Sequence, residues 1–275
     1  MTKLAFAPAL ALLLAPALAQ PPGARDARGP RRPALSAGAA LAVVSQPYAE
    51  AEEGLRAFPI PLIAYQGERF QFAGKTASVT AYAAQAGGTA LTFSAVADYR
   101  FQSYEAEDSP VLVGMANREG TLELGGRARA ERGRVRASLT GLADVLRRHG
   151  GYEVDARLGY ELGDGRARSV VPDAGLRYQS AELTSYYFGV EPDEALNVAC
   201  VRSPCPEALA RPTYAPGGAL APSVGLTVRQ ALGRRLTLFG IARYEVLPDA
   251  VTDSPIVSAD GQVFAFGGVA YAFGG

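Results

Sequence analysis

Most of the chain after residue 33 alternates between apolar and polar side chains with a period of two. The segment 152–162 is the clearest example, with Tyr152, Val154, Ala156, Leu158, Tyr160 and Leu162 on one side and Glu153, Asp155, Arg157 and Glu161 on the other. The segments 121–131 and 220–229 alternate in the same way. Successive side chains of a β-strand point to opposite faces, so this pattern predicts strands with one apolar and one polar face.

Two all-β architectures accommodate such strands: a soluble antiparallel sandwich and a barrel that spans a bilayer. Strands of soluble sheets usually have about 5–6 residues, whereas strands that cross a bilayer need about 9–11. Most of the alternating runs reach ten residues or more, which favours an all-β, antiparallel transmembrane β-barrel of 10–12 strands. The predicted strands are 34–44, 57–66, 67–73, 76–84, 89–101, 118–130, 133–142, 150–162, 166–181, 217–232, 235–247 and 261–273.

The third and fourth predicted strands leave the count open. Both are short and share a tight turn at 73–75, so they could form an incomplete hairpin and leave ten full strands. Either number is even, and an even number returns the chain to the side on which it started. Both termini are therefore expected in the periplasm.

The connections between the strands alternate in length. Short links lie at 85–88, 131–133, 163–165 and 233–234, and long ones at 45–56, 102–117, 183–216 and 249–260. Tight periplasmic turns and longer outer loops are typical of outer-membrane barrels. The alternation therefore supports the barrel over the sandwich.

Composition narrows the range of functions. Lysine plus arginine and aspartate plus glutamate both number 27, so no net charge attracts nucleic acid, and we expect no nucleic-acid partner. Two cysteines and one histidine are too few for a disulfide scaffold or a zinc finger. We predict no metal site and no cofactor.

The N-terminus has the features of an export signal. Lys3 gives a short positive region, an apolar run follows, and Ala17-Leu18-Ala19 forms a small-x-small cleavage site. The alternative, a membrane anchor, is disfavoured because the run is shorter than the about 20 residues of a spanning helix and contains two prolines. We predict a signal peptide over 1–19, a disordered leader over 20–33 and an outer-membrane barrel over 34–273.

The last predicted strand carries a second export feature. Gly268, Tyr271 and Phe273 resemble the C-terminal assembly signal that the barrel-insertion machinery reads. The signal normally ends on its aromatic residue, whereas two glycines follow here. The alternative is an ordinary amphipathic strand with a glycine tail. With the signal peptide, this strand makes outer-membrane lipid and the insertion machinery the expected partners.

Five blocks, in the right order, resemble the MipA/OmpV family of Gram-negative outer-membrane proteins. Two of them lie early in the folded part: the P-Y and P-x-P-x-x-x-Y pattern and the segment 99–115. The others are a Y-F-G-V block, a later tyrosine and a D-S-P-I-V segment before the last strand, so that the blocks span about 47 to 273. The residues that carry the family motifs are Tyr48, Pro59, Pro61, Tyr65, Tyr187, Phe188, Gly189, Val190, Asp253, Ser254 and Pro255.

The resemblance implies a barrel without known catalytic activity. The best-studied relative is described as a scaffold that joins a lytic murein transglycosylase to a murein polymerase, which makes these two enzymes the implied partners. A scaffold function depends on a binding surface, and no motif identifies that surface. The alternative from another class is a narrow outer-membrane channel for small solutes.

Two candidate chemical sites have simpler interpretations. His149, beside two glycines in a predicted outer loop, is the only histidine and so the only candidate base for a hydrolase, but no Gly-x-Ser-x-Gly elbow accompanies it. A solvated loop histidine is the preferred interpretation. Cys200 and Cys205 lie in the longest loop, where an oxidising compartment favours a disulfide over a redox-active pair.

Charged residues line the predicted lumen. If the strand registers are correct, Glu123, Arg127, Arg129, Glu131, Arg134, Arg136, Glu153, Asp155, Arg157, Glu161, Asp173 and Arg177 all point inward. Both signs occur on adjacent strands, which predicts cross-strand ion pairs that fill the interior, while a solvated narrow channel stays the alternative. The loop aromatics at 186–188 and the segment 253–255 could form a lid, a recognition patch or a lipid-interface belt.

Overall fold

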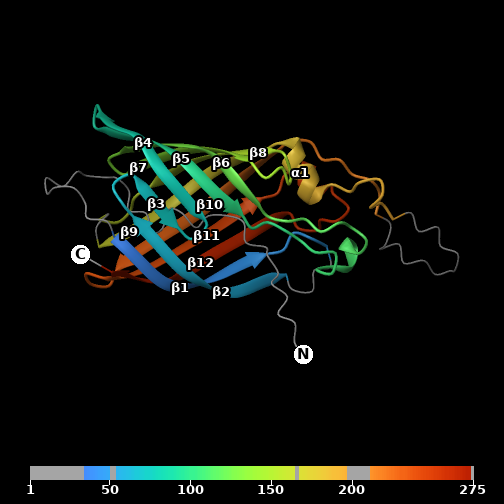
Figure 1. Ribbon diagram of the computed structural model, residues 1–275, viewed down its shortest axis with the longest axis horizontal. Coiled ribbons are helices and arrows are strands. Elements are labelled where there is room, and N and C mark those ends of the chain that lie inside the picture. The colour runs from blue at the N-terminus through green and yellow to red at the C-terminus, as the bar shows by residue number, and fades with distance from the viewer. Residues whose placement is uncertain (1–33, 50–53, 165–166, 197–210, 274–275) are drawn as a thin grey trace.

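The computed structural model describes residues 34–49, 54–164, 167–196 and 211–273. Within these residues the chain forms a closed barrel of twelve antiparallel strands (Figure 1). The prediction of an antiparallel barrel is confirmed, and the count is twelve. The strands are β1 (Ala34–Ser45), β2 (Leu55–Gln66), β3 (Phe70–Ala73), β4 (Thr76–Ala86), β5 (Thr89–Arg100), β6 (Thr121–Arg132), β7 (Val135–Asp144), β8 (Tyr152–Tyr160), β9 (Arg168–Gln179), β10 (Ala219–Ala231), β11 (Leu236–Val246) and β12 (Gly261–Phe273).

The two ends of the barrel differ in their connections. At one end, the turn end, short links such as Gly87-Gly88 join neighbouring strands, and Leu35 pairs with Phe273, so both ends of the described barrel lie there. At the other, the loop end, long connections carry η1 (Pro110–Leu112), α1 (Ala181–Phe188) and α2 (Asp249–Thr252). Among the described residues, no helix is long and apolar enough to cross a bilayer.

The outer surface of the barrel is apolar and the inner surface polar. Leu158 and Val224 are 59% and 58% exposed on the outside, whereas Glu153, on the same strand as Leu158, and Ser223, next to Val224, are buried inside. This is the reverse of a water-soluble protein, and it matches a barrel whose outer face contacts hydrocarbon. The alternation predicted for 121–131, 152–162 and 220–229 is confirmed.

The wall is incomplete beside the short strand β3. β3 pairs with β2 only from Ala64 to Gln66 and with β4 only from Thr76 to Val79. Among the described strands, the loop-end part of β2 and the turn-end part of β4 therefore each have one edge without a partner. The predicted strand 67–73 is shorter than expected because residues 67–69 form the turn from β2.

Two family-motif prolines lie on the open edge of β2. The carbonyl of Ile63 accepts a hydrogen bond from the N–H of Gly74 on the β3 side, so every second residue back along β2 presents its backbone to that edge. Pro59 and Pro61 are two of these residues. Proline has no N–H, so two donors that would otherwise face the gap are absent, which protects an edge strand against pairing with another chain.

Candidate functional site

The loop end is closed by a packed layer of loops, here called the cap, made of residues 46–49, 101–120, 180–196, 211–218 and 247–260. Its buried apolar residues form one cluster: Tyr48, Tyr104, Leu112, Met115, Leu183, Tyr187, Phe188, Val190, Leu247, Val251, Ile256 and Val257, with Ala219 of β10. The rings of Tyr48 and Tyr104 meet edge to face with centroids 5.0 Å apart. Burial raises the pKa of the Tyr104 hydroxyl above its usual value.

Buried arginines hold the loops of the cap together. The Arg211 guanidinium donates to the carbonyl oxygen of Glu194 at 2.6 Å and to that of Val113 at 3.1 Å, so it joins two loops that are distant in sequence. Arg118 donates twice from Nη2 to the Glu194 carboxylate, at 2.8 and 2.9 Å. Although burial acts to raise it, the pKa of Glu194 is lowered by backbone N–H donors and by Arg118. The cap is therefore a folded unit.

An ionic network crosses the lumen beneath the cap. Arg100 on β5 donates to Glu123 on β6 at 2.8 Å and reaches Glu153 on β8 at 3.0 Å. Arg177 on β9 lies 3.0 Å from Glu245 on β11. Further inward-facing ion pairs join Arg157 to Asp155 and Asp173, both at 2.8 Å. Arg157 and Asp155 both lie on β8, whereas the other pairs join different strands, so the predicted cross-strand ion pairs are confirmed for this part of the wall.

His149 belongs to this network. Its side chain is fully buried, Nε2 lies 3.3 Å from the Glu123 carboxylate, and Nδ1 accepts a hydrogen bond from the N–H of Gly151 at 3.0 Å. The interpretation as a solvated loop histidine is wrong, because the rings of Tyr186 and Tyr187 lie beside it. The imidazole is therefore held inside the network, with Nε2 facing the Glu123 carboxylate and Nδ1 accepting from the backbone.

The opposite wall of the lumen is apolar. Side chains from β1, β2, β11 and β12 point inward and pack together: Ala40, Ala42, Leu62, Phe239, Ile241, Phe264, Phe266 and Ala270. The rings of Phe239 and Phe266 have centroids 5.4 Å apart. The network and this wall together occupy the loop-end part and the middle of the lumen.

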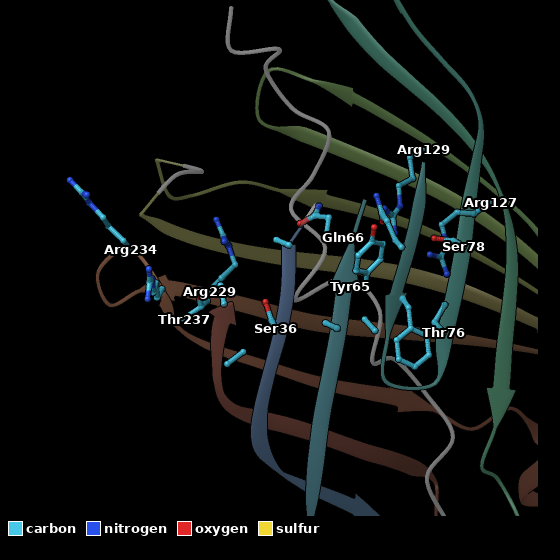
Figure 2. A pocket seen from close by; sticks show the side chains of 18 residues that line it. Ser36, Tyr65, Gln66, Thr76, Ser78, Arg127, Arg129, Arg229, Arg234 and Thr237 are labelled. Carbon is cyan, nitrogen blue, oxygen red and sulfur yellow. The ribbon is translucent and has the colours of Figure 1, made fainter. Parts of the chain in front are cut away.

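A pocket of about 180 Å³ remains at the turn end. Figure 2 shows Arg127 and Arg129 on one side of the pocket, Arg229 on the other, and the polar side chains of β1 and β2 between them. Arg234 and Arg235 lie at its rim, on the turn between β10 and β11. None of the residues that line the pocket is acidic. It is the candidate binding site of the described chain.

The structure brings the later family-motif residues together. Ser254 donates from its hydroxyl to the Phe188 carbonyl at 2.6 Å, and Val190 forms a bridge with Tyr214. Of the three possibilities for these loops, the structure has the lid. Gly268, Tyr271 and Phe273 lie on β12, with the last two rings 5.0 Å apart, and Tyr65 contacts Phe70. Cys200, Cys205, the signal peptide and the leader lie outside the described residues.

Sequence reasoning did not find the turn-end pocket as a unit. Arg127 and Arg129 were predicted to face inward, but Arg229 was noted only for its alternation. The sequence does not show which strands face one another across the lumen, and the pocket depends on β6 facing β10. Among the described residues, no group of histidine, cysteine and carboxylate side chains is arranged to hold a metal ion.

The chain is similar in sequence to known outer-membrane proteins. The family model described as "MltA-interacting protein MipA" matches residues 37–273. YiaT of Escherichia coli strain K12 is 28% identical over 252 residues, covering 87% of this chain and 91% of YiaT. Outer membrane protein OmpV of Vibrio cholerae is 28% identical over 207 residues, covering 75% and 71%.

Two further proteins are similar to this chain. The MltA-interacting protein of E. coli K12 is 26% identical over 253 residues, covering 87% of this chain and 90% of that protein. Among solved structures, an anion-selective porin from Comamonas acidovorans aligns over 88% of this chain and 99% of the porin, with 9% identity and a TM-score of 0.41.

Proposed function

This chain belongs to the MltA-interacting protein MipA family of outer-membrane proteins, and we propose that it is a non-enzymatic scaffold that holds a murein-remodelling enzyme at its turn end. The single observation that carries the proposal is the cap. A lumen closed by a packed cap and crossed by an ionic network is poorly suited to passing solutes. With the lumen closed, the turn end of the barrel is the surface on which a protein partner would bind.

The proposed orientation places the turn end in the periplasm. Short turns face the periplasm in bacterial outer-membrane barrels, and both ends of the described barrel lie at this end. A murein enzyme works in the periplasm, so it would meet this surface and not the cap. The name of one relative, the MltA-interacting protein, supports a lytic murein transglycosylase as the partner class.

The β4–β5 hairpin is the proposed contact surface. It projects beyond the rest of the barrel at the end where the C-terminus lies (Figure 1). On its free side, β4 has no described partner beyond the bond from the Thr80 N–H to Arg69, and Ala81–Ala86 contain neither proline nor charge. An edge of this kind accepts an extended segment of another protein by strand addition. The edge of β2, blunted by two prolines, does not.

We expect full-length protein in planar bilayers to show no steady single-channel conductance. Replacing Arg211 with alanine should produce conductance steps, because the two loops that Arg211 joins would separate. The matched control is Arg148→Ala, which removes an exposed arginine from the loop end, where it pairs with Glu119. Steady conductance of the unchanged protein would refute the closed lumen and favour the narrow solute channel.

The scaffold is tested by capture of a purified lytic murein transglycosylase on the detergent-solubilised full chain. The N–H of Tyr99 bonds to the carbonyl of Lys75, so every second residue of β5 from Tyr99 to Thr89 directs its backbone toward β4. Their partners 82, 84 and 86 form the hydrogen-bonded pairs, which leaves residues 83 and 85 facing the free edge of β4. We expect Ala83→Pro with Gln85→Pro to reduce capture about tenfold or more, since the prolines block strand addition without removing a ladder hydrogen bond. Serine at both positions is the control and should bind normally. No capture by the unchanged chain would overturn the proposal.

A further inference from the structure

The inward-facing arginines of the barrel fall into two groups. Toward the loop end, Arg100, Arg157 and Arg177 each lie within 4.0 Å of a carboxylate. Arg129, at the turn end, has no hydrogen bond and no carboxylate within that distance among the described residues. Arginines in the first group balance the charge of the network. The second group contributes positive charge to the turn-end pocket that the pocket's own lining does not balance.

Arg127 and Arg229 also bring guanidinium groups to the pocket. Arg127 donates from Nε to the Thr140 hydroxyl at 3.0 Å, so a neutral group is the partner of that nitrogen. The nearest inward carboxylate on β5, Asp98, is already held by Lys75 and by the Thr76 hydroxyl. Arg229 reaches the pocket from β10, on the other side of the lumen (Figure 2). Guanidinium groups from two sides thus line one cavity.

The rest of the lining suits an oxyanion. Gln66, Gln71, Ser36 and Ser78 contribute amide and hydroxyl groups, which can donate hydrogen bonds. One water needs about 10–15 Å³ of such space, so a cavity of about 180 Å³ holds on the order of a dozen non-hydrogen atoms. That is the size of a small phosphorylated molecule or a phosphate-bearing headgroup. Planar guanidinium groups recognise phosphate oxygens in pairs.

We propose that the turn-end pocket is a binding site for a phosphate-bearing ligand, held by Arg127, Arg129 and Arg229. A ligand phosphate would accept hydrogen bonds from arginines of β6 and β10 together and so bridge the two sides of the lumen. The site lies inside the barrel and, although Thr76 and Ser78 of β4 line it, it shares no residue with the free edge of β4 at 81–86. It is therefore independent of the scaffold function and can fail or succeed without it.

Isothermal titration calorimetry on the full chain in zwitterionic detergent, with inorganic pyrophosphate as the probe, tests the site. We expect saturable binding that weakens about tenfold or more in Arg129→Gln, the loss of one charge-assisted hydrogen-bonding group. Arg129→Lys should be intermediate, because it keeps the charge and loses the paired donors. The matched control is Arg132→Gln, at the turn end of the same strand, where the side chain is exposed and does not line the pocket. It should change affinity less than about twofold.

A second arm identifies the source of the phosphate. The same variants are titrated into nanodiscs with and without phosphatidic acid, and protection of the pocket is followed by hydrogen exchange. Pyrophosphate binding assigns the pocket to a soluble ligand, and protection by the lipid alone assigns it to a headgroup. Equal weakening in Arg129→Gln and Arg132→Gln would show nonspecific charge attraction and overturn the site, as would no binding in either arm. Faster migration on unboiled gels verifies that each variant is folded.

Discussion

Replacing Glu123 with alanine is expected to lower the free energy of unfolding by about 3–5 kcal/mol, the cost of breaking a buried ion pair from one side. Glu123 is 1% exposed, and its carboxylate is the shared partner of Arg100 and His149. Without it, Arg100 stays buried with Glu153 as its one remaining carboxylate partner in the described chain, and Nε2 of His149 loses the acceptor that it faces. Urea titration of the protein in detergent micelles measures the change. Unfolding is followed by near-ultraviolet circular dichroism of the tyrosines, since the chain has no tryptophan.

The same strand offers a matched control for this variant. Glu131 also faces the lumen from β6, but it lies near the turn end and has no ion pair among the described residues. Glu131→Ala should change the free energy of unfolding by less than about 0.5 kcal/mol. Glu123→Gln separates the effect of the charge from the effect of side-chain shape. The glutamine oxygen can still accept a hydrogen bond from Arg100, but the ion pair is lost. If the two alanine variants unfold alike, the network contributes no special stability.

Much of the fold could be predicted because polar and apolar side chains alternate along each strand of a membrane barrel. Glu153 and Leu158 differ in parity along β8, and that parity alone assigned one to the lumen and the other to lipid. Strand length separated the barrel from a sandwich. The extent of β3 could not be predicted in this way, because residues 67–73 alternate equally well as a strand or as a turn followed by four paired residues.

The cap was harder to predict than the wall. Its residues come from loops without periodicity, and their contacts are set by three-dimensional packing. His149 illustrates this: glycine on both following positions suggested an exposed turn, whereas the carboxylates of Asp144 and Glu123 and the tyrosines of α1 surround it. The turn-end pocket was missed for a related reason, since the facing of β6 and β10 across a lumen has no signature along the chain.

Replacing Gly268 with valine is expected to prevent stable closure of the barrel. Gly268 lies on β12 opposite Ala40 of β1, the strand pair that closes the sheet. A Cβ atom at this position would lie 2.2 Å from the Ala39 carbonyl oxygen and 2.7 Å from the Ala40 Cβ. A Cβ at Gly38, on the facing strand, would lie 2.0 Å from the Val269 carbonyl oxygen. The two backbones approach so closely that a side chain must push the closing strands apart.

The neighbouring residue Gly267 makes the matched control for closure. Its Cβ would lie 3.5 Å from the nearest atom, an ordinary contact, so Gly267→Val should fold. Refolding from urea into detergent, followed by gels of unboiled samples, should give a fast-migrating band for Gly267→Val and none for Gly268→Val. Insertion machinery is absent from this assay. If Gly268→Val refolds normally in detergent yet fails to assemble in cells, the glycine acts in the reading of the C-terminal signal and not in the fit of β1 against β12.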